Sequence, residues 1–196
     1  MTHARILLFA CGSIVWLVGC GSASAADVAA GKALAEGCAG CHGANGISQT
    51  VLTPSLAGQP DEFVQWQLVY FRSGARKSEV MGPIAEALNN EDIRNLGAYY
   101  ASLPPPKPQA PADALAQTGE KLAARHRCKN CHSDDYSGFR AAARLAGQRE
   151  DVLLKALREF KTGARVGSGV ASMADVTYDL SDADMQALAH FMATQP

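Results

Sequence analysis

The 196-residue sequence lacks several patterns that would point to common fold and function classes. Alternation of β-branched and polar residues is absent, so strands are not expected. There is no glycine-rich nucleotide or flavin fingerprint and no surrounding βαβ pattern. The formal net charge of −1 argues against nucleic acid as a partner. An all-α fold is therefore expected.

The cysteines are unevenly placed. Of six cysteines, Cys11 lies in an apolar N-terminal run and Cys20 follows it, while the other four form two close pairs. This distribution leaves no cysteine for a structural disulfide or for a thiolate ligand to iron.

The two pairs belong to a pentapeptide that occurs twice, each time as Cys-x-x-Cys-His. The copies run from Cys38 to His42 and from Cys128 to His132. This pattern is typical of c-type haem attachment, in which two thiols form thioethers and the histidine binds iron. A zinc site or a redox dithiol are the alternatives, but the adjacent histidine in both copies favours haem. The predicted attachment residues are Cys38, Cys41, Cys128 and Cys131, and the predicted iron ligands include His42 and His132.

The chain is a duplication with a proline-rich connection. Leu56–Gln59 reappears as Leu145–Gln148 with an offset of 89 positions, and Gly74–Arg76 reappears as Gly163–Arg165 with the same offset. We predict one domain over residues 27–103, a linker over 104–113 and a second domain over 114–196.

Each half is predicted to contain three main helices. The first precedes the cysteine pair, over Lys32–Cys38 and Glu120–Cys128. The second follows the repeated Leu-Ala-Gly-Gln, where acidic residues favour a helix N-terminus. The third opens with a capping box, Asn89 with Asp92 in one half and Ser181 with Asp184 in the other.

A six-coordinate haem needs a second axial ligand. In residues 27–103 the only methionine is Met81. Adding the offset of 92 that relates the third helices leads from Met81 to Met173, which makes Met185 and Met192 core residues. Met81 and Met173 are the predicted ligands, since thioether sulfur opposite imidazole is a known pairing.

Two other histidines are weaker candidates for this role. His126 is poorly placed, only two residues before Cys128, and His190 is expected on the surface. With both axial positions filled, the chain is predicted to transfer electrons rather than to act as an enzyme.

The first 25 residues resemble an export signal, with a basic start and an apolar run too short to span a bilayer comfortably. Two processing patterns overlap. Ala23–Ala25 fits an ordinary signal peptidase, whereas Leu17–Cys20 resembles a bacterial lipobox whose cysteine receives lipid. Both predict a periplasmic protein, and the second predicts a membrane anchor at Cys20.

Taken together, these motifs resemble those of the dihaem cytochrome c4 family. The similar segments are Cys38–Gly43, Pro54–Gln59, Phe71–Arg76, Met81 with Leu88–Ile93, Phe160–Arg165 and Met173. The resemblance implies two tandem cytochrome c class I domains related by pseudo-twofold symmetry, each with a covalent His/Met-ligated haem c. It also implies a periplasmic respiratory-chain carrier, often membrane-associated, between a quinol-oxidising cytochrome bc complex and terminal oxidases.

The second half departs from this pattern. In the family, a proline carbonyl orients the proximal histidine; Pro54 fits, but its counterpart is Ala143. The halves also differ in charge, with a net −3 over residues 27–103 and +1 over 114–196. Arg125, Arg127 and Lys129 cluster at the second haem motif, either as a solvated face or as a docking patch for an acidic redox partner.

Two other functions remain open from the sequence. One is a cytochrome subunit that accepts electrons from a periplasmic dehydrogenase, such as a sulfide-oxidising flavocytochrome. The other is a haem enzyme such as a peroxidase, which would require an open iron site.

Overall fold

The computed structural model describes residues 25–165 and 170–196. The expected export signal lies outside these ranges except for Ala25, and so does the lipobox cysteine Cys20. The described residues form helices and no strand, with one isolated bridge between Phe139 and Ala142, which confirms the all-α class. None of these helices combines the length and apolar character needed to cross a bilayer.

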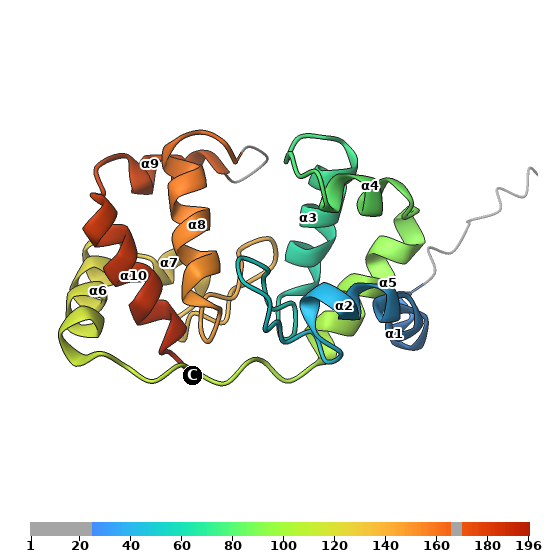
Figure 1. The fold of residues 1–196 in the computed structure, drawn as a ribbon, viewed down its shortest axis with the longest axis horizontal. Helices are drawn as coiled ribbons and strands as arrows, with labels where there is room; N and C mark the ends of the chain where they lie inside the picture. Colours follow the sequence, from blue (N-terminus) through green and yellow to red (C-terminus); the bar gives the residue numbers. More distant parts are fainter. Residues whose placement is uncertain (1–24, 166–169) are drawn as a thin grey trace, which may run out of the picture.

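The helices follow the same order in both halves (Figure 1). In the first half they are α1 (Val28–Ala35), the short 3₁₀ helix η1 (Glu36–Cys38), α2 (Ala39–His42), α3 (Asp61–Arg72), α4 (Met81–Glu86) and α5 (Asn90–Ser102). In the second half they are α6 (Asp113–Arg125), α7 (Lys129–His132), α8 (Glu150–Lys161), α9 (Val170–Tyr178) and α10 (Asp182–Ala193). In the first half α5 packs against α1 and α3, and in the second α10 packs against α6 and α8.

Local sequence signals fix several helix starts. Asn89 and Asp92 form the predicted capping box at α5, and Ser181 and Asp184 form the one at α10. Each cap satisfies backbone N–H groups that have no partner within the helix, which is worth about 1 kcal/mol.

Glycine permits the closest helix crossing in each half. A Cβ atom on Gly31 of α1 would lie 2.1 Å from the carbonyl oxygen of Asn95 in α5. A Cβ atom on Gly119 of α6 would lie 2.2 Å from the carbonyl oxygen of Ala187 in α10. Any larger residue would push the helices apart.

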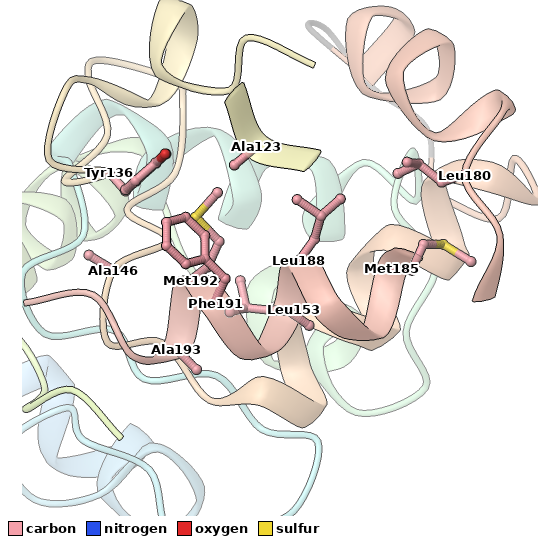
Figure 2. Packing of buried hydrophobic residues seen from close by; sticks show 11 residues of the cluster. Ala123, Tyr136, Ala146, Leu153, Leu180, Met185, Leu188, Phe191, Met192 and Ala193 are labelled. Atoms are coloured by element: carbon pink, nitrogen blue, oxygen red, sulfur yellow. The ribbon is translucent and has the colours of Figure 1, made fainter. Parts of the chain in front are cut away.

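The core of the second half lies where α10 packs against α6 and α8 (Figure 2). It includes Leu153, Leu188 and Phe191, together with Met185 and Met192, which are only 3% and 4% exposed. The prediction that these two methionines are core residues is confirmed.

His190 is not on the surface, contrary to the sequence expectation. It is buried on α10, where Nε2 accepts the Ala112 N–H at 2.9 Å and Nδ1 lies 2.8 Å from a Glu150 carboxylate oxygen. The end of the linker passes over α10 there, and its backbone N–H needs an acceptor. The offset of 92 pairs His190 with Ala98 in the first half, and alanine has no polar side chain that would indicate such bonds.

The proline-rich connection is packed against the folded halves. It runs along one side of both of them (Figure 1). Pro106 is buried, and the Gln109 N–H donates to the Ala193 carbonyl at 2.9 Å. These contacts hold the linker in one path.

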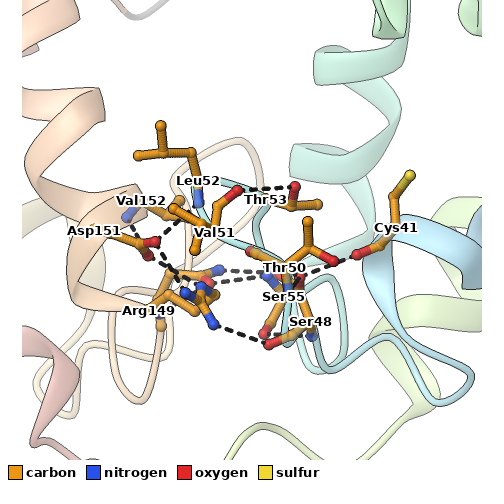
Figure 3. A network of polar contacts seen from close by, with 11 residues as sticks. Cys41, Ser48, Thr50, Val51, Leu52, Thr53, Ser55, Arg149, Asp151 and Val152 are labelled. Atoms are coloured by element: carbon orange, nitrogen blue, oxygen red, sulfur yellow. Dashed lines mark hydrogen bonds and ion pairs between the residues drawn. The ribbon is translucent and has the colours of Figure 1, made fainter.

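The two halves face each other through the loops that follow the cysteine motifs. The Leu52 N–H donates to Asp151 at 2.9 Å, and Arg149 donates to the Ser48 carbonyl at 3.4 Å (Figure 3). This places the segments after both cysteine motifs at one interface.

Candidate haem sites

The first attachment segment lies on a short turn of helix. Cys38 ends η1, and Cys41 and His42 lie in α2. Cys38 is half-buried against the core of the first half, whereas Cys41 is exposed. Both thiols are free, as covalent attachment requires.

The ring of His42 is held in place by a hydrogen bond from Nδ1. Its side chain is buried, and Nδ1 donates to the Pro54 carbonyl at 2.8 Å, which leaves Nε2 for a metal. Burial lowers the pKa of His42 more than the hydrogen bond to Pro54 raises it. The ring is therefore neutral at neutral pH, which is the state that binds iron.

The second segment repeats this arrangement. Cys128 is half-buried and Cys131 exposed, both as free thiols, and His132 ends α7. His132 Nδ1 donates to the Ala143 carbonyl, again at 2.8 Å. Burial lowers the pKa of this histidine as well, with the bond to Ala143 opposing it. The backbone carbonyl thus keeps its place although alanine replaces proline.

The two predicted methionines occupy matching elements. Met81 begins α4, and Met173 lies within α9; both are partly buried. The Met81 N–H donates to Ser78 Oγ at 3.0 Å, and the Met173 carbonyl accepts from Thr177 Oγ1 at 2.9 Å. Neither helix was predicted as one of the main helices.

A pair of partly buried arginines meets between the halves. Arg76 and Arg165 both donate to Gln67 Oε1, at 2.7 and 2.8 Å. Burial lowers the pKa of Arg76 to about 10, and burial together with the charge of Arg76 lowers that of Arg165 to about 9. Glu159 lies 4.0 Å from Arg76 and also pairs with Lys155, so positive charge remains in excess.

The donor set fits a haem c in each half. It provides two free thiols on one helical turn, a neutral histidine oriented through Nδ1, and partly buried cations suited to the propionate carboxylates of haem.

Sequence reasoning left two residue pairs without a role. These pairs are Arg76 with Arg165 and Gln59 with Gln148, which were recognised only as members of the repeated segments. The signal was a polar residue retained in both copies. Gln59 and Gln148 are buried at 4% and 5% exposure and hydrogen-bond across the interface.

Comparison with known proteins gives matches over nearly the whole chain. The family described as Cytochrome c matches twice, at residues 28–104 and 116–196. A thiosulfate dehydrogenase electron acceptor of Thiomonas intermedia is 33% identical, covering 94% of this chain and 88% of that protein. A cytochrome c4 of Pseudomonas aeruginosa is 30% identical, covering 86% of this chain and 89% of that protein.

A solved structure has the same arrangement. Reduced recombinant cytochrome c4 from Pseudomonas stutzeri superimposes with a TM-score of 0.82 and 28% sequence identity. The match covers 88% of this chain and all of the other.

Proposed function

The chain belongs to the cytochrome c family, within it to the dihaem cytochrome c4 family, and we propose that it carries electrons between two protein partners in the periplasm. It is an electron-transfer protein with two covalent haem c groups and is not an enzyme. Bound haem supplies a reversible one-electron couple at iron.

Four side chains hold the irons in this proposal. His42 and Met81 bind one iron, and His132 and Met173 bind the other. The support is the neutral, Nδ1-anchored histidine in each half and the matching positions of the methionines at α4 and α9. With both axial positions filled, transfer is outer-sphere.

The electron donor in this proposal is a periplasmic dehydrogenase that oxidises a reduced sulfur compound. The observation that carries this choice is the similarity, over nearly the full chain, to a thiosulfate dehydrogenase electron acceptor. The second candidate donor is a quinol-oxidising cytochrome bc complex, with terminal oxidases as acceptors, and similarity to cytochrome c4 proteins favours it.

Anaerobic stopped-flow reduction separates the two donors. The oxidised holoprotein is mixed with thiosulfate dehydrogenase plus thiosulfate, and separately with a bc complex plus quinol. We expect both haems to be reduced, and faster by the dehydrogenase. Reduction by the bc complex alone would favour the second candidate, and reduction by neither would contradict the proposed carrier role.

The basic cluster at the second haem motif is the proposed docking patch. Arg125, Arg127 and Lys129 are exposed there, and Lys129 lies 5.4 Å from the Tyr136 ring. Long-range attraction to an acidic partner raises the association rate and is screened by salt. Reversing Arg125 and Arg127 to glutamate should slow reduction at low salt, whereas Arg94→Glu, an exposed control on the first domain, should not.

The proposed location is the periplasm, with a lipid anchor at Cys20 if the lipobox is used. Fractionation of cells that express the wild type and Cys20→Ala tests this. Release of the variant from membranes supports the anchor. A soluble wild-type protein that starts at Ala26 would rule it out.

A further inference from the structure

Two glutamines cross the interface in opposite directions and make matching bonds. The Gln148 amide accepts the Ser55 N–H at 2.9 Å and donates to the Ser55 carbonyl at 2.8 Å. The Gln59 amide accepts the Arg144 N–H at 3.0 Å and donates to the Arg144 carbonyl at 2.9 Å. Each domain thus holds one residue of the other by both backbone groups.

The residues held in this way directly follow the carbonyls that orient the proximal histidines. The Ser55 N–H belongs to the same peptide group as the Pro54 carbonyl, which accepts from His42 Nδ1 at 2.8 Å. A continuous chain of hydrogen bonds therefore runs from the ring of His42, through one peptide group, to Gln148 in the other domain.

The second site repeats this chain with the roles of the domains exchanged. The Arg144 N–H shares a peptide group with the Ala143 carbonyl, which accepts from His132 Nδ1 at 2.8 Å. That chain ends at Gln59 in the first domain.

Hydrogen bonds in such a chain strengthen one another. A peptide group that donates its N–H to an amide oxygen carries more negative charge on its carbonyl oxygen. The carbonyl then accepts more strongly from the histidine Nδ1–H, which makes the imidazole a more basic ligand. A more basic ligand stabilises the ferric state and lowers the potential.

We propose that Gln148 and Gln59 are positioning residues that act across the interface, each tuning the proximal histidine, and hence the haem potential, of the opposite domain. The inference rests on the proposed ligand roles of His42 and His132. Contact between the two domains is then part of each redox site, because separating the domains would remove the interdomain hydrogen bonds of both glutamines.

A purely mechanical role for the glutamines predicts something different. Other contacts also join the domains, among them Leu52 with Asp151 and Arg165 with Gln67. If the glutamines only held the domains together, their loss would loosen the interface for both haems or for neither. Tuning through the peptide group predicts a crosswise effect, in which the loss of each glutamine shifts the potential of the haem in the opposite domain only.

The test uses Gln148→Met and Gln59→Met in the full-length holoprotein, because methionine is similar in size but does not reproduce the paired amide bonds. Spectroelectrochemical titration measures both potentials, and NMR assigns each haem to its domain through contacts with residues of known sequence position. We expect Gln148→Met to raise the potential of the haem at His42 and to leave the other unchanged. Gln59→Met should raise only the potential of the haem at His132.

A second readout reports on the histidines directly. In the ferrous protein, the Nδ1–H proton resonance of His42 should move upfield in Gln148→Met, and that of His132 in Gln59→Met. The matched control is Gln67→Met, which removes an interdomain amide that bonds to neither peptide group. It should leave both Nδ1–H resonances in place.

Equal shifts at both haems, a shift confined to the domain that carries the substitution, or unchanged Nδ1–H resonances would overturn the proposal. If the methionine variants do not fold, Gln148→Asn and Gln59→Asn replace them. Their amides are one methylene shorter and should break the same bonds, with the same crosswise result. Reduction by a donor protein is not part of this test, so its outcome is independent of the donor proposed above.

Discussion

His132 donates its Nδ1–H to the Ala143 carbonyl at 2.8 Å, the same separation that His42 has from Pro54. Backbone geometry therefore reproduces in the second domain a bond that proline supports in the first. What alanine does not supply is the fixed φ angle of proline.

Replacing Ala143 with proline should affect one haem only. Ala142, which would precede the new proline, lies in the isolated bridge with Phe139 and outside any helix, and proline disfavours a helical residue before it. Because the proline ring restricts the backbone that carries this carbonyl, the hydrogen bond from His132 should become stronger, and the potential of the second haem should fall. Spectroelectrochemical titration measures this, and a shift of the first haem by the same amount would contradict it.

Removing either proposed methionine ligand should remove one iron–sulfur bond. Met81→Ala and Met173→Ala should each weaken the long-wavelength ferric charge-transfer band by roughly half, because in the proposed ligation two Met-ligated haems contribute to it. Each should also lower the potential of one haem, since the soft thioether donor is lost.

Met185→Ala provides the control for this experiment. Met185 is 3% exposed in the core, so its truncation should cost about 2–5 kcal/mol of unfolding free energy and leave the band intact. A larger loss of the band in Met185→Ala than in Met173→Ala would show that the repeats were aligned wrongly.

The features predicted correctly from the sequence depend on short segments. The capping boxes at Asn89 and Ser181 need only neighbouring residues, and α3 and α8 begin at Asp61 and Glu150, where acidic side chains indicated a helix start. The cysteine motifs were recognisable because their spacing is local and occurs twice. Two family matches over the same halves agree with this duplication.

The features missed depend on how the halves pack. Spacing along the chain does not reveal that Gln148 faces Ser55, because 93 positions separate them and no secondary structure links them. The same holds for Arg165 and Gln67. His190 was misplaced because its partner Ala112 belongs to the linker, whose path is set by tertiary contacts.

The helix crossing at Gly31 gives a prediction about stability. A Cβ atom there would meet the Asn95 carbonyl at 2.1 Å, so Gly31→Ala must displace α1 from α5. We expect a loss of about 1–3 kcal/mol in the free energy of unfolding, measured with urea. Gly37→Ala is the control, because a Cβ atom at Gly37 has no neighbour within 4 Å. Equal stability of the two variants would show that the crossing tolerates a methyl group.

Asp151 is expected to make the protein sensitive to acid. Its carboxylate accepts the Leu52 N–H of the first domain at 2.9 Å and two hydrogen bonds from Arg149, at 3.0 and 2.9 Å. Burial raises the pKa of Asp151, but these bonds from Arg149 and Leu52 together outweigh it and hold the pKa below the ordinary value of 3.8.

A carboxyl group whose pKa is lower in the folded protein adds stability above pH 3.8 and loses it as pH falls through the folded pKa. Urea unfolding of the holoprotein at a series of pH values should therefore show a steeper acid loss in the wild type than in Asp151→Asn, which has no carboxyl group to protonate there. Asp179→Asn, at an exposed position, corrects for the change in net charge. If the wild type and Asp151→Asn lost stability in parallel below pH 3.8, the Asp151 carboxylate would not be a source of the acid sensitivity.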